Sequence, residues 1–263
     1  MSGSSGDETT TGTTALAPNP AQVVRFEASE LVYPGGTVAL RGVDLTVHAG
    51  EFVSIVGPSG CGKSSLLRIA SGLEAATGGH TVVDTDRIGY VFQEATLLPW
   101  RTVRDNVALF AELDRVSKAE RYRRADAAIE LVGLSGFADQ LPRALSGGMR
   151  MRVSLARSLS VDPELFLFDE PFGALDEITR QRLGDEITEL FAQRRFAGLF
   201  VTHSVTEAVY LSTRVVVMSG RPGRIVDEIE VPFDFPRVPE IRYTGEFTAL
   251  ASRVSKALRG SHR

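Results

Sequence analysis

The chain has 263 residues with a net charge of −4, and 43% of the residues are hydrophobic and 24% charged. This length suits one α/β core with a helical insertion, and the composition is that of an ordinary soluble globular protein. The acidic balance argues against nucleic acid as the main partner, and no run approaches the roughly 20 apolar residues that cross a bilayer.

Residues 1–21 are rich in Ser, Thr, Gly and Pro and lack the charged-then-apolar pattern of an export signal. We expect them to form a disordered tail, followed by one folded domain over residues 22–260. Apolar and β-branched runs in the first part of that domain predict short strands and one helix. The strands are expected at 23–32, 38–47, 51–56, 81–83 and 87–92, and the helix at 63–71.

The middle of the chain changes to a charged, helical pattern at 102–136, and a further helix is predicted at 147–159. We expect these helices to form an inserted subdomain over about 100–160. Strands and helices then alternate again, which implies a largely parallel sheet covered on both faces. The strands are expected at 165–168, 198–202 and 214–218, and the helices at 176–192, 204–211 and 244–258.

A glycine-rich run joins the predicted strand at 51–56 to the predicted helix after it, which is the context that a phosphate-binding loop requires. Its glycines let successive N–H groups point into one concavity, and the helix start adds its positive dipole end. We expect Lys63 to reach the β- and γ-phosphates of ATP and Ser64 to bind Mg²⁺. The alternative is a chance glycine-rich turn. The expected nucleotide-binding residues here are Gly57, Pro58, Ser59, Gly60, Cys61, Gly62, Lys63, Ser64 and Ser65.

The chain's single cysteine, Cys61, stands inside this loop. It cannot form an internal disulfide, which fits a reducing compartment. We expect it to fill a small slot, with a thiol that makes the loop sensitive to alkylation.

An apolar strand at 165–168 ends in two carboxylates, Asp169 and Glu170. Asp169 is expected at the carboxyl end of the sheet, where ligands of doubly wound folds bind, and in the coordination shell of Mg²⁺. Glu170 is expected to act as the general base that polarises the attacking water. The alternative is a charged strand end that faces solvent.

Ser146, Gly147 and Gly148 open the predicted helix at 147–159 and form a second potential anion site, with backbone donors and a positive dipole end. One ATP has no need of two such sites from the same chain. We therefore expect these residues to bind the γ-phosphate of an ATP held by a second copy. The alternative is that Ser146 simply caps its own helix.

The order of these motifs resembles the nucleotide-binding subunit of an ATP-binding-cassette (ABC) transporter, over residues 22 to 260. The motifs that carry this resemblance follow one another along the chain. They are the phosphate loop, Gln93 in Val-Phe-Gln-Glu, Leu145-Ser146-Gly147-Gly148-Met149, Asp169-Glu170, Gly173-Ala174-Leu175-Asp176, and His203 in Val-Thr-His-Ser.

This resemblance implies a P-loop NTPase cassette with a mostly parallel sheet core, an antiparallel β subdomain and an inserted helical subdomain. It implies an ATPase with ATP and Mg²⁺ as cofactors. The partners are expected to be a second copy and two transmembrane permease subunits, with a solute-binding protein indirectly and without nucleic acid. The expected location is the cytoplasmic face of the cell membrane.

The resemblance also implies roles for four further residues. Gln93 would sense Mg²⁺ and the water while linking the site to the membrane subunit, and His203 would contact the γ-phosphate. Asp176 would belong to a loop that crosses the dimer interface, and Tyr33 would stack on adenine. The alternatives are a surface amide for Gln93, a capping or core histidine for His203, and a core strand aromatic for Tyr33.

Three segments, Met149-Arg150, 97–100 and 172–176, are similar to the importers of nitrate, sulfonates, taurine and related compounds. Met151 departs from the family pattern, in which a polar Gln is common. The transported solute stays open among nitrate, an alkanesulfonate, taurine, an aromatic acid and a thiamine-precursor pyrimidine.

Two other functions stay open at this point. One is a soluble ABC-type ATPase acting on DNA or ribosomes, against which the acidic charge and the lack of a long coiled-coil insertion argue. The other is a regulatory subunit without turnover, against which Asp169, Glu170 and His203 argue.

Overall fold

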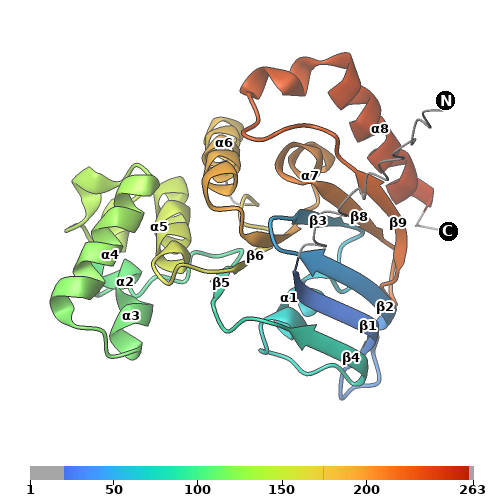
Figure 1. Cartoon of the computed structure of the whole chain (residues 1–263), viewed down its shortest axis with the longest axis horizontal. Helices are drawn as coiled ribbons and strands as arrows, with labels where there is room; N and C mark the ends of the chain where they lie inside the picture. Colours follow the sequence, from blue (N-terminus) through green and yellow to red (C-terminus); the bar gives the residue numbers. More distant parts are fainter. Residues whose placement is uncertain (1–20, 174, 261–263) are drawn as a thin grey trace, which may run out of the picture.

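Two β-sheets organise the chain, and a group of four helices lies to one side of the larger sheet (Figure 1). The computed structural model describes residues 21–173 and 175–260. The predicted disordered tail, apart from Ala21, therefore lies outside the described residues, as does Ala174 of the Gly173–Asp176 motif.

The larger sheet has six strands, of which five are parallel and the last, β9, runs antiparallel to its neighbour. In spatial order the strands are β5 (Ile88–Val91), β6 (Leu165–Asp169), β7 (Ala197–Val201), β3 (Phe52–Val56), β8 (Arg214–Met218) and β9 (Ile225–Glu230). All residues of β3 and β7 are buried, as expected for strands covered on both faces. The sequence reading missed β9 because half of its residues are acidic and most of its side chains are not buried.

The smaller sheet is antiparallel, with the order β2-β1-β4. Its strands are β1 (Gln22–Val32), β2 (Val38–His48) and β4 (Gly78–Val83), so β4 begins earlier than predicted. Helix α1 (Lys63–Ala70) contacts strands of both sheets. The start of α1 is therefore fixed between two layers of structure.

The helical group consists of α2 (Val103–Val107), α3 (Leu109–Leu113), α4 (Lys118–Leu131) and α5 (Gly147–Leu159). Two 3₁₀ turns, Ser135–Phe137 and Pro142–Ala144, lead from α4 to α5. Arg157 of α5 donates hydrogen bonds to the backbone carbonyls of Ala95 and Thr96 at 3.2 and 3.1 Å. This side chain ties α5 to the loop that follows β5.

The remaining helices cover the larger sheet and end the described chain (Figure 1). They are α6 (Glu177–Arg194), α7 (Val205–Leu211), the 3₁₀ helix Pro239–Tyr243 and α8 (Gly245–Gly260). A cluster of aromatic rings fills the core beneath them, and Phe52 contacts Phe191 edge-on with ring centroids 5.4 Å apart. Phe168 and Phe200 belong to this cluster and lie on the paired strands β6 and β7, whose ends are side by side.

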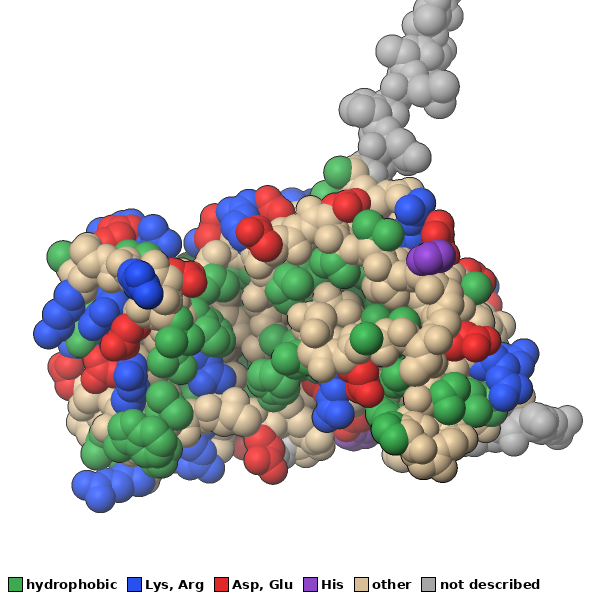
Figure 2. All heavy atoms as spheres, turned by 90° about the horizontal axis from the view of Figure 1, so that it is seen from below, with side chains coloured by type: hydrophobic (Ala, Val, Ile, Leu, Met, Phe, Trp, Pro, Cys, Tyr) green, Lys and Arg blue, Asp and Glu red, His purple; other side chains and the backbone are tan. Residues whose placement is uncertain are grey.

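The surface mixes charges of both signs. Figure 2 shows one face, on which positive and negative side chains alternate and hydrophobic side chains gather between them. No helix within residues 21–173 and 175–260 is long and apolar enough to cross a membrane.

Candidate active site

The glycine-rich loop between β3 and α1 has a shape that only glycine permits at two positions. Gly60 and Gly62 have φ angles of +73° and +106°, in the left-handed region that side chains rarely adopt. A Cβ atom on Gly62 would also lie 2.7 Å from Leu40 Cδ2 and 2.9 Å from the carbonyl oxygen of Ala39. The loop is therefore pressed against β2 of the smaller sheet.

Lys63 points back into this loop. Its Nζ donates hydrogen bonds to the carbonyls of Gly57 and Pro58, both at 3.0 Å, and the residue is only 5% exposed. The ammonium group is thus held beside the backbone that is expected to surround the phosphates.

The position of Cys61 argues against the expected sensitivity of this loop to alkylation. The residue is 1% exposed, and burial raises the pKa of its thiol. Alkylating reagents attack an accessible thiolate, so a buried and protonated thiol reacts slowly.

Ser64 and Asp169, predicted separately as metal ligands, meet at the start of α1. The Ser64 hydroxyl donates to Oδ1 of Asp169 at 2.7 Å, and the Tyr90 hydroxyl donates to Oδ2 at 3.4 Å. Burial raises the pKa of Asp169, the hydrogen bond from Ser64 opposes this shift, and the charge of Glu170 adds to it. A hydroxyl beside a carboxylate offers the oxygen ligands that Mg²⁺ prefers, so these residues fit the expected ion.

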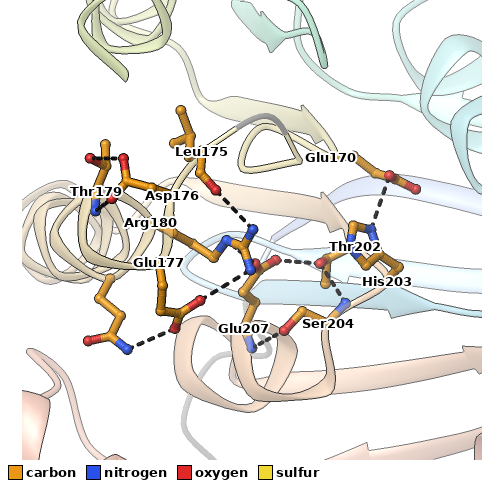
Figure 3. A network of polar contacts seen from close by, with 11 residues as sticks. Glu170, Leu175, Asp176, Glu177, Thr179, Arg180, Thr202, His203, Ser204 and Glu207 are labelled. Atoms are coloured by element: carbon orange, nitrogen blue, oxygen red, sulfur yellow. Dashed lines mark hydrogen bonds and ion pairs between the residues drawn. The ribbon is translucent and has the colours of Figure 1, made fainter. Parts of the chain in front are cut away.

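Glu170 adopts an unusual backbone conformation directly after β6. Its φ of +46° lies in the left-handed region, which is uncommon outside glycine, and its N–H donates to the carbonyl of Val201 at 3.0 Å. Strained backbone of this kind clusters at functional sites. The conformation turns the carboxylate toward His203, whose Nδ1 lies 3.3 Å from Glu170 Oε2 (Figure 3).

His203 follows β7, the neighbour of β6. Its side chain is 59% exposed, so it is not a core histidine, and the cap of α7 is the adjacent Ser204. The two strand ends therefore bring the expected base and the expected γ-phosphate contact together.

Gln93 and Tyr33 lie at the edges of this site. Gln93 is exposed, and its Nε2 would lie 3.6 Å from a Cβ on Gly173, so its amide approaches the segment that follows Glu170. The Tyr33 hydroxyl lies 2.9 Å from Ser65 Oγ on α1, which places a half-buried ring next to the phosphate loop. Stacking of this ring on adenine stays a prediction.

The Ser146–Gly148 turn opens α5, and its Gly147 lines the same groove as Gln93. The Ser146 hydroxyl accepts a hydrogen bond from the Met149 N–H at 3.2 Å, so the serine does cap α5. Ser146 and Gly147 are exposed, and a Cβ on Gly148 would lie 2.5 Å from Thr179 of α6. In the described part of the chain, no hydrogen bond or ion pair joins this turn to Gly57–Ser65.

Asp176 caps α6 near this turn. Its carboxylate accepts hydrogen bonds from the Thr179 N–H at 3.0 Å and from the Thr179 hydroxyl at 2.7 Å. The hydrogen bond from the Thr179 N–H lowers the pKa of this exposed carboxyl. Asp176 therefore presents a stable negative charge at the surface.

Comparison with known proteins bears on the same residues. Residues 40–173 match the family model described as ABC transporter. The chain is 46% identical over 218 residues to the aliphatic sulfonates import ATP-binding protein of Pseudomonas syringae, covering 83% of this chain and 90% of that protein. The chain belongs to the ABC transporter family. It is also 41% identical over 239 residues to the nitrate import ATP-binding protein of Synechocystis, covering 86% of this chain and 90% of that protein.

Solved ABC cassettes share the fold. A dimeric ATP-binding cassette in a post-hydrolysis state, bound to ADP and Pi, is 31% identical with a TM-score of 0.71. The similarity covers 80% of this chain and 100% of that cassette. The predicted ABC fold, with its parallel core, antiparallel sheet and helices, is confirmed.

Several residues of the site in this ABC cassette were not predicted from the sequence. Tyr90 contacts Asp169, and the Arg221 guanidinium donates to the carbonyl of Gly60 at 2.9 Å. Arg180 and Glu207 form an ion pair between α6 and α7. One signal was available for this pair, because each residue stands four positions after a motif residue, Asp176 or His203.

Met151, which departs from the family pattern, has a structural explanation. It is 4% exposed and belongs to the hydrophobic core around α5. A thioether fits such an apolar position.

Proposed function

We propose that this chain is the ATP-hydrolysing subunit of an importer and works as a pair of copies beneath two permease subunits. One observation carries this proposal. The phosphate loop, Asp169, Glu170 and His203 converge in one place, whereas the Ser146–Gly148 turn stands exposed elsewhere on the same chain.

The residues of the first cluster have distinct tasks in ATP hydrolysis. Lys63 and the loop N–H groups bind the phosphates. Their preorganised positive charge stabilises the negative charge that develops in the transition state. Ser64 and Asp169 would hold Mg²⁺, which when bound neutralises phosphate charge. Glu170 accepts a proton from the attacking water. The 3.3 Å contact with His203 keeps this base beside the group that is proposed to contact the γ-phosphate.

The second copy supplies what this cluster lacks. Ser146 and Gly147 present a helix start with its positive dipole end toward solvent, and an anion binds there favourably. We assign the γ-phosphate of the partner's ATP to this place. Asp176, exposed at the start of α6, is proposed to contact the facing copy.

The permease is proposed to contact a groove beside Gln93. This groove has a volume of about 520 Å³ and runs between the loop after β5 and the start of α5. Its lining includes Gln93, Leu97, Pro142 and Arg150. Trp100, in the same loop, is 72% exposed. Contact here would place the chain at the cytoplasmic face of the membrane.

The solute is proposed to be small and anionic or zwitterionic, such as nitrate, a sulfonate or taurine. This proposal is supported by the relatives named for sulfonate and nitrate import. A solute-binding protein would then deliver the solute to the permease, without direct contact with this chain.

Co-purification and transport test the proposal together. The chain is co-expressed with the permease genes adjacent to its own gene, purified in detergent, and reconstituted in liposomes with the matching binding protein. We expect stable complexes and Mg²⁺-dependent ATPase activity stimulated by one of the candidate solutes. A chain that purifies with nucleic acid or ribosomes and ignores the permease would contradict the proposal.

A further inference from the structure

Arg180 joins the start of α6 to the segment that precedes it. One guanidinium NH₂ group donates to the carbonyl of Leu175 at 3.1 Å, and Nε lies 3.4 Å from Oε1 of Glu207 (Figure 3). Arg180 also pairs with Glu177 at 3.3 Å. A single side chain thus contacts the backbone next to Asp176 and a carboxylate on α7.

Glu207 holds the residues on both sides of His203. Its Oε2 accepts a hydrogen bond from the Thr202 hydroxyl, and its N–H donates to the Ser204 hydroxyl at 3.3 Å. The Thr202 hydroxyl in turn accepts from the Ser204 N–H at 3.0 Å. Thr202 is 1% exposed and the Glu207 side chain 12%, so these bonds are shielded from water and strengthened accordingly.

The pair has space in which to shift. Arg180 and Glu207 line a cavity of about 160 Å³ between α6 and α7, together with Phe172 and Tyr210. A displacement of the start of α6 can therefore carry Arg180, and with it Glu207, without meeting closely packed core on every side.

We propose that Arg180 and Glu207 are positioning residues that couple the segment around Asp176 to His203. Contact of Asp176 with a second copy would then set the position of the His203 ring. This inference rests on the proposed function as a dimeric ATPase. Neither residue is placed against ATP, so both act through other groups.

Three variants test this coupling. Arg180→Gln removes the guanidinium and its charge. Arg180→Lys keeps the charge opposite Glu207 but loses the fork that also reaches Leu175, and Glu207→Gln removes the charge of the carboxylate. The matched control is Arg123→Gln, which breaks an Arg–Glu pair on the exposed side of α4. Each variant is assayed for kcat, KM and binding of a fluorescent ATP analogue to the monomer. In a Glu170→Gln background, each is also assayed for the ATP concentration that gives half-maximal dimer.

We expect Arg180→Gln to lower kcat by roughly 10- to 100-fold, because small misplacement of reacting groups has effects of this size. Glu207→Gln should show a similar loss and Arg180→Lys a smaller one. Dimer formation should need more ATP, whereas affinity of the monomer for the analogue and the behaviour of Arg123→Gln stay as in the wild type.

A folded Arg180→Gln variant with wild-type kcat and a lowered Tm alone would overturn the coupling and leave a structural ion pair. If Arg180→Gln fails to fold, Arg180→Lys and Glu207→Gln decide by the same readouts. A wild-type chain that neither hydrolyses ATP nor dimerises would overturn the proposed function itself. A hydrolysing, dimerising wild type with unaffected variants overturns only this inference.

Discussion

The chain contains two glycine-rich turns at helix starts, and they differ in how much of their environment the chain itself supplies. The loop before α1 is held by β2, by its own lysine and by the Ser64–Asp169 hydrogen bond. The turn before α5 has an exposed serine and glycine, and the Ser146 hydroxyl accepts a hydrogen bond that caps α5 itself. The chain itself surrounds the first turn, whereas the second turn is exposed at the surface.

This difference supports the proposal that one ATP site is formed by two chains. Backbone donors at a helix start bind anions, and a nucleotide pocket adds a lysine and carboxylates to such donors. The loop before α1 has Lys63, Asp169 and Glu170 as companions, but among the described residues no hydrogen bond or ion pair joins the turn before α5 to any of them. The exposed Ser146 and Gly147 are therefore the place that we propose for the ATP of a facing copy.

The largest expected effect comes from Glu170→Gln. This variant should trap a dimer in which the phosphate loop of each copy faces the Ser146–Gly148 turn of the other. Loss of the general base should lower kcat by roughly 10²- to 10⁴-fold, while ATP binding persists because the phosphate contacts remain. Light scattering should then show an ATP-dependent dimer. The exposed Glu130→Gln serves as control and should turn over normally. A Glu170→Gln chain with ordinary turnover would remove Glu170 from its proposed role.

A mixing experiment tests directly whether the two turns of one site come from different chains. Lys63→Ala and Ser146→Arg should each be nearly inactive alone. In mixed dimers, one site combines the intact phosphate loop of the second variant with the intact turn of the first. An equimolar mixture should therefore regain roughly a quarter of wild-type ATPase, if copies pair at random in an isologous dimer.

The outcome that would break the comparison is a mixture no more active than the sum of its parts, with no ATP-dependent dimer. Circular dichroism and thermal unfolding of each variant alone check that both are folded before mixing. Rescue without any dimer would equally contradict a shared site.

A glycine-to-alanine substitution in each turn should lower the unfolding free energy by different amounts. Gly62→Ala requires a side chain at a φ of +106° and within 2.7 Å of Leu40, so it should lower the unfolding free energy by about 1–3 kcal/mol. Gly147→Ala meets no atom closer than 3.9 Å and should change it by less than about 0.5 kcal/mol. Urea unfolding measures both. Equal losses would show that the two turns are equally confined.

Local patterns were enough to predict most of the fold and to name the candidate site residues. Strand, glycine-rich loop and helix predict the phosphate site because its contacts lie close along the chain. The pairing of Glu170 with His203, and of Arg180 with Glu207, arises between adjacent strand ends or helices, which sequence spacing does not show. Strand β9 was missed because an acidic edge strand lacks the apolar run used to predict the others.

Thiol labelling gives the smallest expected effect and measures the closure of the first turn. Because the reagent attacks the thiolate, and burial raises the pKa of Cys61, iodoacetamide should label the native protein roughly tenfold or more slowly than urea-unfolded protein.

The raised pKa of Cys61 also makes stability depend on pH, because the folded state holds the thiol proton more tightly than the unfolded state. This contribution to stability is therefore full below the unfolded thiol pKa and is lost as the pH rises through the folded one.

The second turn provides the matched measurement. In a Cys61→Ser background, Ser146→Cys places a thiol where the serine is exposed, so labelling should be fast. Combined with Glu170→Gln and ATP, the same thiol should become protected, because a facing copy then covers it. Slow labelling of Ser146→Cys without nucleotide would show that the second turn is already covered by its own chain. Rapid labelling of native Cys61 would show that the phosphate loop opens without a partner, and the contrast between the two turns would then lose its structural basis.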